Sequence, residues 1–239
     1  MGDVEERVNQ HTGDGAEGEG VAQRLAAVKH RIAHAATDAG RTDPVHLVAV
    51  TKTFHADHIR PALAAGQLVV GENRVQEAKA KWPPLREEFP DIELHLLGPL
   101  QSNKAKDAVA LFDVIQSVDR EKIANAIAKA ADDAGRMPRC MVQVNIGQEP
   151  QKAGVAPQDA GPLVDKCKSL GLPVIALMAI PPAADPPAPH FKALAQLAAD
   201  IGVPATSMGM SGDYEEAIAQ GATWVRVGSA IFGARPPVG

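Results

Sequence analysis

The chain has 239 residues, of which 45% are hydrophobic and 22% are charged, a composition typical of a globular protein. Its formal net charge is −5, and its 24 lysines and arginines are spread along the chain, which argues against a nucleic-acid-binding or membrane-binding surface. Cys140 and Cys167 lack the spacing of a metal site and are expected to be buried, reduced thiols. The N-terminus is acidic and no apolar stretch reaches transmembrane length, so we expect a cytoplasmic protein without a metal.

The N-terminal part of the chain divides into a polar segment and a helix. Residues 1–19 are polar and rich in glycine, which predicts a flexible tail, and residues 20–239 are expected to form a single domain. A helix should open this domain, because apolar residues recur at helical spacing and the pattern stops at Gly40. The apolar residues of this helix are Val21, Leu25, Val28 and Ile32.

From Val45 onward, short β-rich stretches alternate with alanine-rich helical stretches, which predicts parallel βαβ units. Eight strands match a closed (β/α)8 TIM-type barrel, so the predicted fold is an α/β barrel with an extra N-terminal helix. A doubly wound open sheet is the alternative, but the first strand ends in TKTF rather than in a glycine-rich turn. The expected strands are Val45–Lys52, Leu68–Asn73, Ile92–Gly98, Val114–Val118, Arg139–Ile146, Pro173–Ile180, Ala205–Ser211 and Trp224–Phe232.

Boundary signals mark two of the helices and one loop. The helix Arg120–Ala134 follows Asp119, which can serve as its N-cap, and the helix Asp213–Gln220 stops before Gly221. The proline-rich loop Pro181–Pro189 follows the sixth strand. It should therefore lie at the C-terminal rim, where barrel active sites form.

Lys52 ends the first strand, at the edge of the barrel where functional side chains gather. Val48, Val50 and Lys52 share one face of the strand, so the amine points into the barrel if the two valines do. Desolvation there would lower the pKa of the lysine, as Schiff-base formation requires. The alternative is a rim lysine that reaches solvent or pairs with Glu72 or Asp119.

Two small, hydroxylated turns follow the seventh and eighth strands, where barrels commonly bind phosphate. The first turn contains Met210 and Ser211, and the second contains Gly228 and Ser229. Backbone N–H groups, hydroxyls and room for close approach suit an anion at such turns. The alternative is a pair of tight strand-to-helix turns in which Ser211 caps a helix.

Further polar residues are expected at the same rim. Arg226 shares a face with Gly228, so it should enter the barrel and either form an internal salt bridge, for example with Glu72, or face a ligand. Asn73 suits a ligand contact because an amide both donates and accepts hydrogen bonds. His95 is expected to be a core histidine rather than a catalytic base.

Five segments in sequence order resemble the pyridoxal-phosphate homeostasis proteins, which are short relatives of the alanine racemase barrel domain. These segments are Val48–Thr53, Gly71–Glu77, His95–Lys104, Gly209–Ser211 and Arg226–Gly233. Weaker similarity is present at Gln143–Ile146, Lys152–Gly154 and Leu177–Ile180. The match spans residues 21–235. It departs from the family pattern at Arg74, where a tyrosine is common, and at Gly212-Asp213-Tyr214, where acidic residues often follow the Gly-Met-Ser turn.

The resemblance implies a barrel that carries pyridoxal 5′-phosphate (PLP) as a Schiff base on Lys52. In this arrangement Arg226 faces the pyridine nitrogen, and the turns after the last two strands hold the phosphate. The implied cofactor-binding residues are Lys52, Asn73, Met210, Ser211, Arg226, Gly228 and Ser229.

The residues around this cofactor favour a carrier over an enzyme. An arginine beside the pyridine nitrogen weakens the electron sink that PLP provides. Related racemases take a second acid/base, a tyrosine, from an additional domain of the partner subunit, whereas this chain ends at Gly239, soon after the eighth strand. Its single tyrosine, Tyr214, is expected on a helix surface. We therefore expect a protein of vitamin B6 homeostasis with no catalytic residues and little or no turnover.

Two other functions stay open. One is a PLP-dependent amino-acid racemase, or a related fold-type III enzyme, whose second base is Lys104 or His95. The other is a Schiff-base aldolase in which Lys52 attacks a sugar carbonyl without a cofactor. For the carrier, the expected partners are PLP itself and the PLP-dependent apoenzymes that receive it, and the chain is expected to be a monomer.

Overall fold

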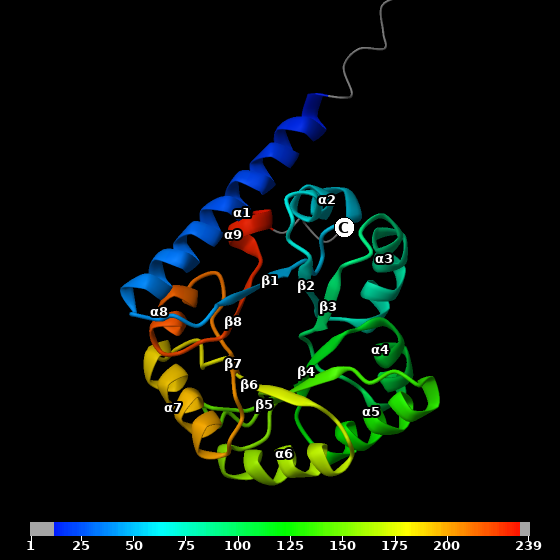
Figure 1. The fold of residues 1–239 in the computed structure, drawn as a ribbon, viewed down its shortest axis with the longest axis vertical. Coiled ribbons are helices and arrows are strands. Elements are labelled where there is room, and N and C mark those ends of the chain that lie inside the picture. The colour runs from blue at the N-terminus through cyan, green and yellow to red at the C-terminus, as the bar shows by residue number, and fades with distance from the viewer. Residues whose placement is uncertain (1–11, 235–239) are drawn as a thin grey trace, which may run out of the picture.

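The computed structural model describes residues 12–234, which form a closed barrel of eight parallel strands surrounded by helices (Figure 1). Each strand pairs with the next, and the last pairs with the first, so the described sheet has no free edge. The predicted barrel is therefore confirmed. The strands are β1 (His46–Val50), β2 (Val69–Glu72), β3 (Glu93–Leu96), β4 (Val114–Val118), β5 (Arg139–Gln143), β6 (Val174–Met178), β7 (Thr206–Ser207) and β8 (Trp224–Val227).

Helices connect the strands on the outside of the barrel, as parallel pairing requires. Two short 3-10 turns, Ser102–Lys104 and Pro157–Asp159, precede the fourth and sixth of them. The helices are α1 (Thr12–Asp38), α2 (Ala56–Ala64), α3 (Val75–Glu88), α4 (Ala105–Leu111), α5 (Glu121–Ala134), α6 (Ala160–Ser169), α7 (Pro187–Asp200), α8 (Tyr214–Ala219) and α9 (Ser229–Phe232).

Alternation along the strands divides the apolar residues between the two faces of the barrel wall. Leu47 and Ala49 of β1 belong to the large core between the wall and the helices. Val48 lies between them in the sequence and belongs to a separate cluster, which fills the barrel interior. The inward orientation that the sequence predicts for this face of β1 is therefore confirmed. The buried members of the interior cluster are Val48, Val114, Met141, Ala176, Met178 and Trp224.

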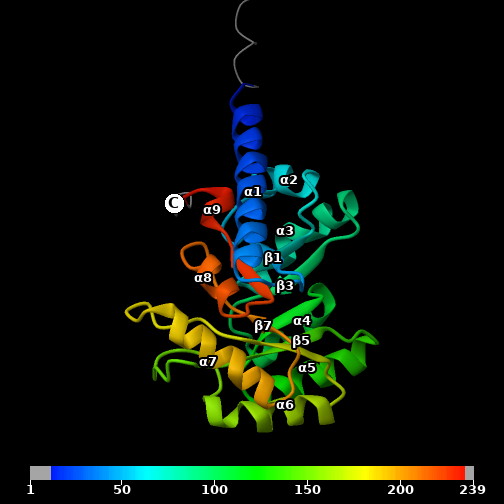
Figure 2. The ribbon, with the colours of Figure 1, turned by 60° about the vertical axis from the view of Figure 1, so that its left-hand side comes forward.

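Helix α1 lies along the outside of the barrel beside α2, α8 and α9 (Figure 2). Arg24 donates to the carbonyl of Ile231 in α9 at 2.7 Å, and Arg31 pairs with Glu215 of α8 at 2.6 Å. The helix thus ties together segments from both ends of the chain. Its buried apolar residues are the ones that the periodicity predicts, Val21, Leu25, Val28 and Ile32.

The start of α1 differs from the prediction. The helix begins at Thr12, inside the segment for which the composition predicts a flexible tail. Once the packed part of the helix has formed, each residue added to its end gains one backbone hydrogen bond, which allows the helix to extend into this segment. The expected tail also includes residues 1–11, which lie outside the described part of the chain.

The end of the last strand also differs from the prediction. The strand is expected to continue to Phe232, but β8 ends at Val227 and a short helix follows Gly228. The apolar pattern of such a short segment does not show where a strand ends and a helix begins, because both conformations can bury the same residues.

Two other helix starts need correction. Arg120, not Asp119, occupies the N-cap position of α5, and the Asp119 carboxylate accepts a hydrogen bond from the Arg120 guanidinium at 2.5 Å. Helix α7 begins at Pro187 and so takes in the end of the expected proline-rich loop, because proline is well suited to the first turn of a helix.

The two cysteines are free and buried, as predicted. Burial raises the pKa of both thiols, that of Cys167 to about 11. Within residues 12–234, no helix is long and apolar enough to cross a membrane, and no three potential ligands cluster in a way that could hold a metal.

Gly209, after β7, has a backbone that excludes a side chain. Its φ is +89°, and a Cβ there would lie 2.6 Å from the Ala217 Cβ. We expect Gly209→Ala to lower the free energy of unfolding, measured by urea denaturation, by about 2–4 kcal/mol through backbone strain and overpacking. Gly212→Ala is the matched control, because no atom lies within 4 Å of its Cβ position. Equal stability of the two variants would contradict this explanation.

Candidate functional site

A cavity of about 660 Å³ opens at the C-terminal ends of the strands. Its described lining includes three cationic side chains, Lys52, Lys152 and Arg226, and no aspartate or glutamate. A cavity with this balance of charge favours an anionic ligand. The residues that line it are Val50, Lys52, Phe54, Asn73, Leu97, Gly98, Pro99, Gln143, Gln151, Lys152, Ala153, Met178, Ile180, Met210, Ser211, Gly212, Arg226, Gly228, Ser229 and Gly233.

Lys52 lies two residues beyond the end of β1. Val48 fills the barrel interior, and Val50 and Lys52 line the cavity above it, so the three residues follow one face of the strand as predicted. The Lys52 side chain is half-buried. Its amine therefore belongs to the cavity rather than to the outer surface of the barrel.

The turn that carries Lys52 is held from behind by α3. The Lys81 ammonium donates to the carbonyl of Thr51 at 2.9 Å, and the backbone N–H of Thr53 donates to the Glu77 carboxylate at 2.6 Å. Thr53 has a φ of 69°, which a β-branched residue rarely adopts. Such a conformation persists only where surrounding contacts impose it. These two hydrogen bonds therefore fix the direction in which Lys52 leaves the strand.

Glu72 anchors this support inside the protein. Its carboxylate is fully buried and accepts hydrogen bonds from Thr51 Oγ1 at 2.7 Å, Lys81 Nζ at 2.8 Å and Trp82 Nε1 at 3.1 Å. Burial raises the pKa of Glu72, and the nearby Lys81 ammonium opposes that shift. Glu72 is thus paired with Lys81 of α3 rather than with Arg226.

The turns after β7 and β8 lie side by side. The backbone N–H of Gly228 donates to Ser211 Oγ at 3.1 Å, which leaves the hydroxyl hydrogen of Ser211 available to a ligand. Ser229 and Ala230 open α9, so their N–H groups have no acceptor within that helix. Asp213, not Ser211, occupies the N-cap position of α8. The two turns therefore present several hydrogen-bond donors to the cavity.

Arg226 is 4% exposed and reaches the cavity from the barrel wall. Its guanidinium donates to Ser207 Oγ at 2.7 Å and to the carbonyl of Ala179 at 2.9 Å. Burial lowers its pKa to about 10, and the charge of Asp213 opposes the shift. The internal salt bridge with Glu72, which the sequence left open, is not formed.

The structure brings every sequence-predicted site residue to one cavity and leaves other candidates outside it. Lys52, Asn73, Met210, Ser211, Arg226, Gly228 and Ser229 all belong to its lining. His95 and Lys104 do not. Tyr214 is 1% exposed, with the Arg31 guanidinium of α1 5.4 Å from its ring centre, so the predicted surface position of this tyrosine is wrong. Tyr214 is the first residue of α8, and the packing of α8 against α1 covers it.

Glycines let the backbone pass close to the cavity at two points. A Cβ at Gly98 would lie 2.1 Å from the carbonyl oxygen of Asn73, so the chain can approach Asn73 only with a glycine there. A Cβ at Gly228 would lie 3.2 Å from the carbonyl oxygen of Val50, tighter than most real contacts. These approaches place the turn after β3 next to Asn73, and the turn after β8 next to the end of β1.

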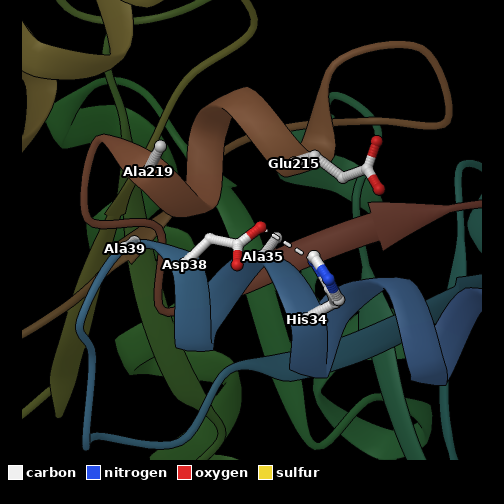
Figure 3. Close-up of a pocket in the computed structure, with 6 residues that line it drawn as sticks. All are labelled: His34, Ala35, Asp38, Ala39, Glu215 and Ala219. Carbon is white, nitrogen blue, oxygen red and sulfur yellow. Dashed lines mark ion pairs between the residues drawn. The ribbon is translucent and has the colours of Figure 1, made fainter.

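A second hollow, of about 280 Å³, lies on the outside of the barrel between α1 and α8 (Figure 3). It contains an exposed ion pair, in which His34 Nδ1 is 2.8 Å from Asp38 Oδ2, and the Glu215 side chain lies nearby. Its described lining has neither a lysine nor an arginine and shares no residue with the central cavity. The central cavity is therefore the candidate site.

Comparison with known proteins identifies the family. The sequence profile of the alanine racemase N-terminal domain matches residues 23–236. A pyridoxal phosphate homeostasis protein of Pseudomonas aeruginosa is 44% identical over 226 residues, which cover 90% of this chain and 96% of the relative. A protein of the same name from Escherichia coli is 36% identical over 226 residues, which cover 90% and 97%. The chain belongs to the pyridoxal phosphate homeostasis protein family.

Solved structures agree with this assignment. PipY of Synechococcus elongatus, in its structure with PLP bound, has a TM-score of 0.78 and 38% identity, and the match covers 89% of this chain and all of PipY. A protein of unknown function from Bifidobacterium adolescentis has a TM-score of 0.84 and 32% identity, with 96% of this chain covered. Alanine racemase of Clostridium difficile, at 14% identity and a TM-score of 0.70, shares the fold, and the match covers 58% of its chain.

Sequence reasoning missed three polar residues of the cavity, Gln143, Gln151 and Lys152. Gln143 and Lys152 belong to segments of weak resemblance and were given no role. The Lys152 ammonium donates to the carbonyl of Pro181 at 2.9 Å and pairs with Glu149 at 2.6 Å, so it ties the loop after β5 to the loop after β6. A contact between two loops leaves no periodic pattern in the sequence, so nothing could have indicated Lys152. Gln143 ends a strand, and that position could have indicated a place in the cavity.

The support behind Lys52 can be tested through stability. We expect Lys81→Met to lower the free energy of unfolding in urea by about 3–5 kcal/mol, because it leaves the buried Glu72 carboxylate without its cation. Lys79→Met, on the exposed side of α3 where Lys79 pairs with Asp107, should change it by less than about 0.5 kcal/mol. A small effect of Lys81→Met would mean that Glu72 does not depend on this ion pair.

Proposed function

We propose that this chain binds PLP as a Schiff base on Lys52 and acts in PLP homeostasis, with little or no catalytic turnover. One observation carries the proposal: a cavity at the strand ends is lined by Lys52 and two other cations, and its described lining contains no carboxylate. PLP supplies both an aldehyde for an amine and a phosphate for a cationic site. Relatives named for PLP homeostasis, and the PLP-bound structure of PipY, support it.

The turns after β7 and β8 fit the phosphate. Ser211 and Ser229 offer hydroxyl donors, and Gly228 allows the backbone to come close to a ligand without a side chain in the way. Met210 lies beside them in the first turn, and Asn73 offers an amide from the end of β2. Together with Lys52 and Arg226, these residues form the proposed cofactor-binding set.

Arg226 would face the nitrogen of the pyridine ring. When bound, PLP stabilises negative charge on an attached amino acid, most strongly when that nitrogen is protonated. The guanidinium only donates hydrogen bonds, and its positive charge disfavours a second positive charge beside it. Arg226 would therefore keep the nitrogen unprotonated, which weakens the chemistry that an enzyme would need.

A second acid/base is the feature that a racemase would require. The described cavity lining has no tyrosine, histidine, cysteine, aspartate or glutamate, and besides Lys52 its one other lysine is Lys152. Lys152 is engaged with Glu149 and the carbonyl of Pro181. A racemase would have to use this lysine, rather than His95 or Lys104 as the sequence suggested. These contacts support the carrier over the enzyme.

The carrier proposal extends to partners and domain organisation. PLP-dependent apoenzymes would receive the cofactor, and the protein would act in the cytoplasm. Residues 20–239 would form the PLP-binding domain. The protein would bind PLP as a monomer.

The covalent link can be located by mass spectrometry. We expect borohydride treatment of the PLP-loaded protein to fix the cofactor to the peptide that contains Lys52, and Lys52→Ala to abolish the label without unfolding the barrel. Lys104→Ala should retain the label, because Lys104 lies outside the cavity. A label on Lys152 would contradict the assignment, and failure of the protein to take up PLP would favour a cofactor-free aldolase.

Turnover can be measured directly. We expect the PLP-loaded protein to racemise amino acids no faster than free PLP with a lysine-containing peptide does, because the described lining of the cavity has no tyrosine to act as a base. Circular dichroism of single enantiomers of several amino acids measures this rate. A stereospecific turnover that Lys152→Met abolishes would establish the racemase instead.

A further inference from the structure

A row of buried polar side chains crosses the barrel interior below the cavity. The Arg226 guanidinium donates to Ser207 Oγ, and the Ser207 hydroxyl donates to Gln116 Oε1, each at 2.7 Å. Gln116 Nε2 lies 2.7 Å from His95 Nδ1, and His95 Nε2 lies 2.7 Å from Glu93 Oε1. We call these five residues, Arg226, Ser207, Gln116, His95 and Glu93, the polar chain. It runs from the cavity to the first residue of β3, at the opposite end of the barrel.

The middle of the polar chain has no access to solvent. Ser207, Gln116 and His95 are each 0% exposed, and their strands, β7, β4 and β3, form different parts of the barrel wall. A buried polar group without a partner costs about 1–3 kcal/mol, so each member depends on its neighbours. The outer end is more open, where Glu93 also pairs with Arg139 at 2.7 Å.

The hydrogen bonds of the polar chain all run in one direction, starting from Arg226. A guanidinium only donates, so Ser207 Oγ accepts from it, and the Ser207 hydroxyl donates to the carbonyl oxygen of Gln116. The amide nitrogen of Gln116, which only donates, faces the imidazole of His95.

The same logic fixes the state of His95. Its Nδ1 must accept from Gln116, so its single hydrogen is on Nε2, where it is donated to the Glu93 carboxylate. An imidazolium would place an N–H against the N–H of Gln116 and break the polar chain. Burial also lowers the pKa of His95, although Glu93 acts in the opposite direction.

We propose that Ser207, Gln116, His95 and Glu93 are positioning residues for Arg226, which hold its guanidinium towards the PLP ring and lock His95 as a neutral imidazole. This inference rests on the proposed function for the identity of the ligand. It also gives His95 a role that excludes it as a racemase base, since both of its nitrogens are already engaged. Glu93, whose pKa is lowered to about 2 mainly by its bond to His95, is the anionic end of an assembly whose cationic end is Arg226.

The state of His95 can be tested without PLP. Nitrogen NMR of the full chain with labelled histidine should show His95, identified by the signal lost in His95→Asn, as a neutral imidazole with its hydrogen on Nε2. Gln116→Glu should convert it to an imidazolium, because a carboxylate can only accept. An imidazolium, or a hydrogen on Nδ1, in the unmodified protein would overturn the proposal.

The effect on the ligand can be tested with a matched pair of serines. Ser117 is 1% exposed, like Ser207, but lies next to Gln116 in β4 and outside the polar chain. We expect Ser207→Ala to weaken PLP affinity about tenfold and Ser117→Ala to change it by less than about twofold, with both variants folded by thermal melting. Equal affinities would overturn the positioning role. If the unmodified protein does not bind PLP, the proposed function is refuted. The NMR experiment would still test the state of His95, because it needs no PLP.

Discussion

Hydrogen bonding between the first and last strands is the constraint on which the site depends. Because β1 pairs with β8, Val48 lies opposite Arg226 and Ala49 opposite Val227. Lys52 is therefore carried to the turn that contains Gly228, although the two residues are far apart in the sequence. In an open sheet with the same strand order, β1 and β8 would lie at opposite edges. The turns after β7 and β8 could then not share a cavity with Lys52.

Charge is distributed unevenly across the barrel wall. The cations Lys52, Lys152 and Arg226 line the cavity, whereas the buried carboxylate of Glu72 is paired with Lys81 of the outer helix α3. A cavity whose described lining holds cations and no carboxylate attracts an anionic ligand, and a bound ligand stabilises the folded state in proportion to its binding. The buried pair of Glu72 and Lys81 also supports the turn that carries Lys52, because both side chains bond to Thr51.

The polar residues of the barrel interior connect the site to the rest of the fold. Arg226 reaches the cavity, but its hydrogen bonds lead away from it through Ser207 and Gln116 to His95. A buried arginine needs partners for its donors, and here they are the Ser207 hydroxyl of β7 and the carbonyl of Ala179, which follows β6. The position of the guanidinium is thus a property of the closed barrel rather than of its own strand.

Much of the site could be predicted from the sequence, because it depends on local order. Strand ends in a parallel barrel share one rim, so Lys52, Ser211 and Gly228 could be assigned to it from their positions alone. Tyr214 could not be placed, since whether a residue at the start of a helix is buried depends on the helix that packs against it. The boundary between β8 and α9 could not be predicted either, because a strand and a helix bury the same apolar residues there.

The sequence by itself determined the number of strands, the residues that share a face on the first and last of them, and the residue types at the strand ends, because periodicity and strand-end position act over short stretches of chain. Only the tertiary structure decided the partners: Lys81 for Glu72, Ser207 for Arg226, and α1 as the cover of Tyr214. These contacts join residues that lie on different elements. From the sequence alone, any of several carboxylates or hydroxyls could have been the partner of a given buried group. Which of these groups come within hydrogen-bonding distance of one another is decided only when the barrel has closed and the helices have packed against it.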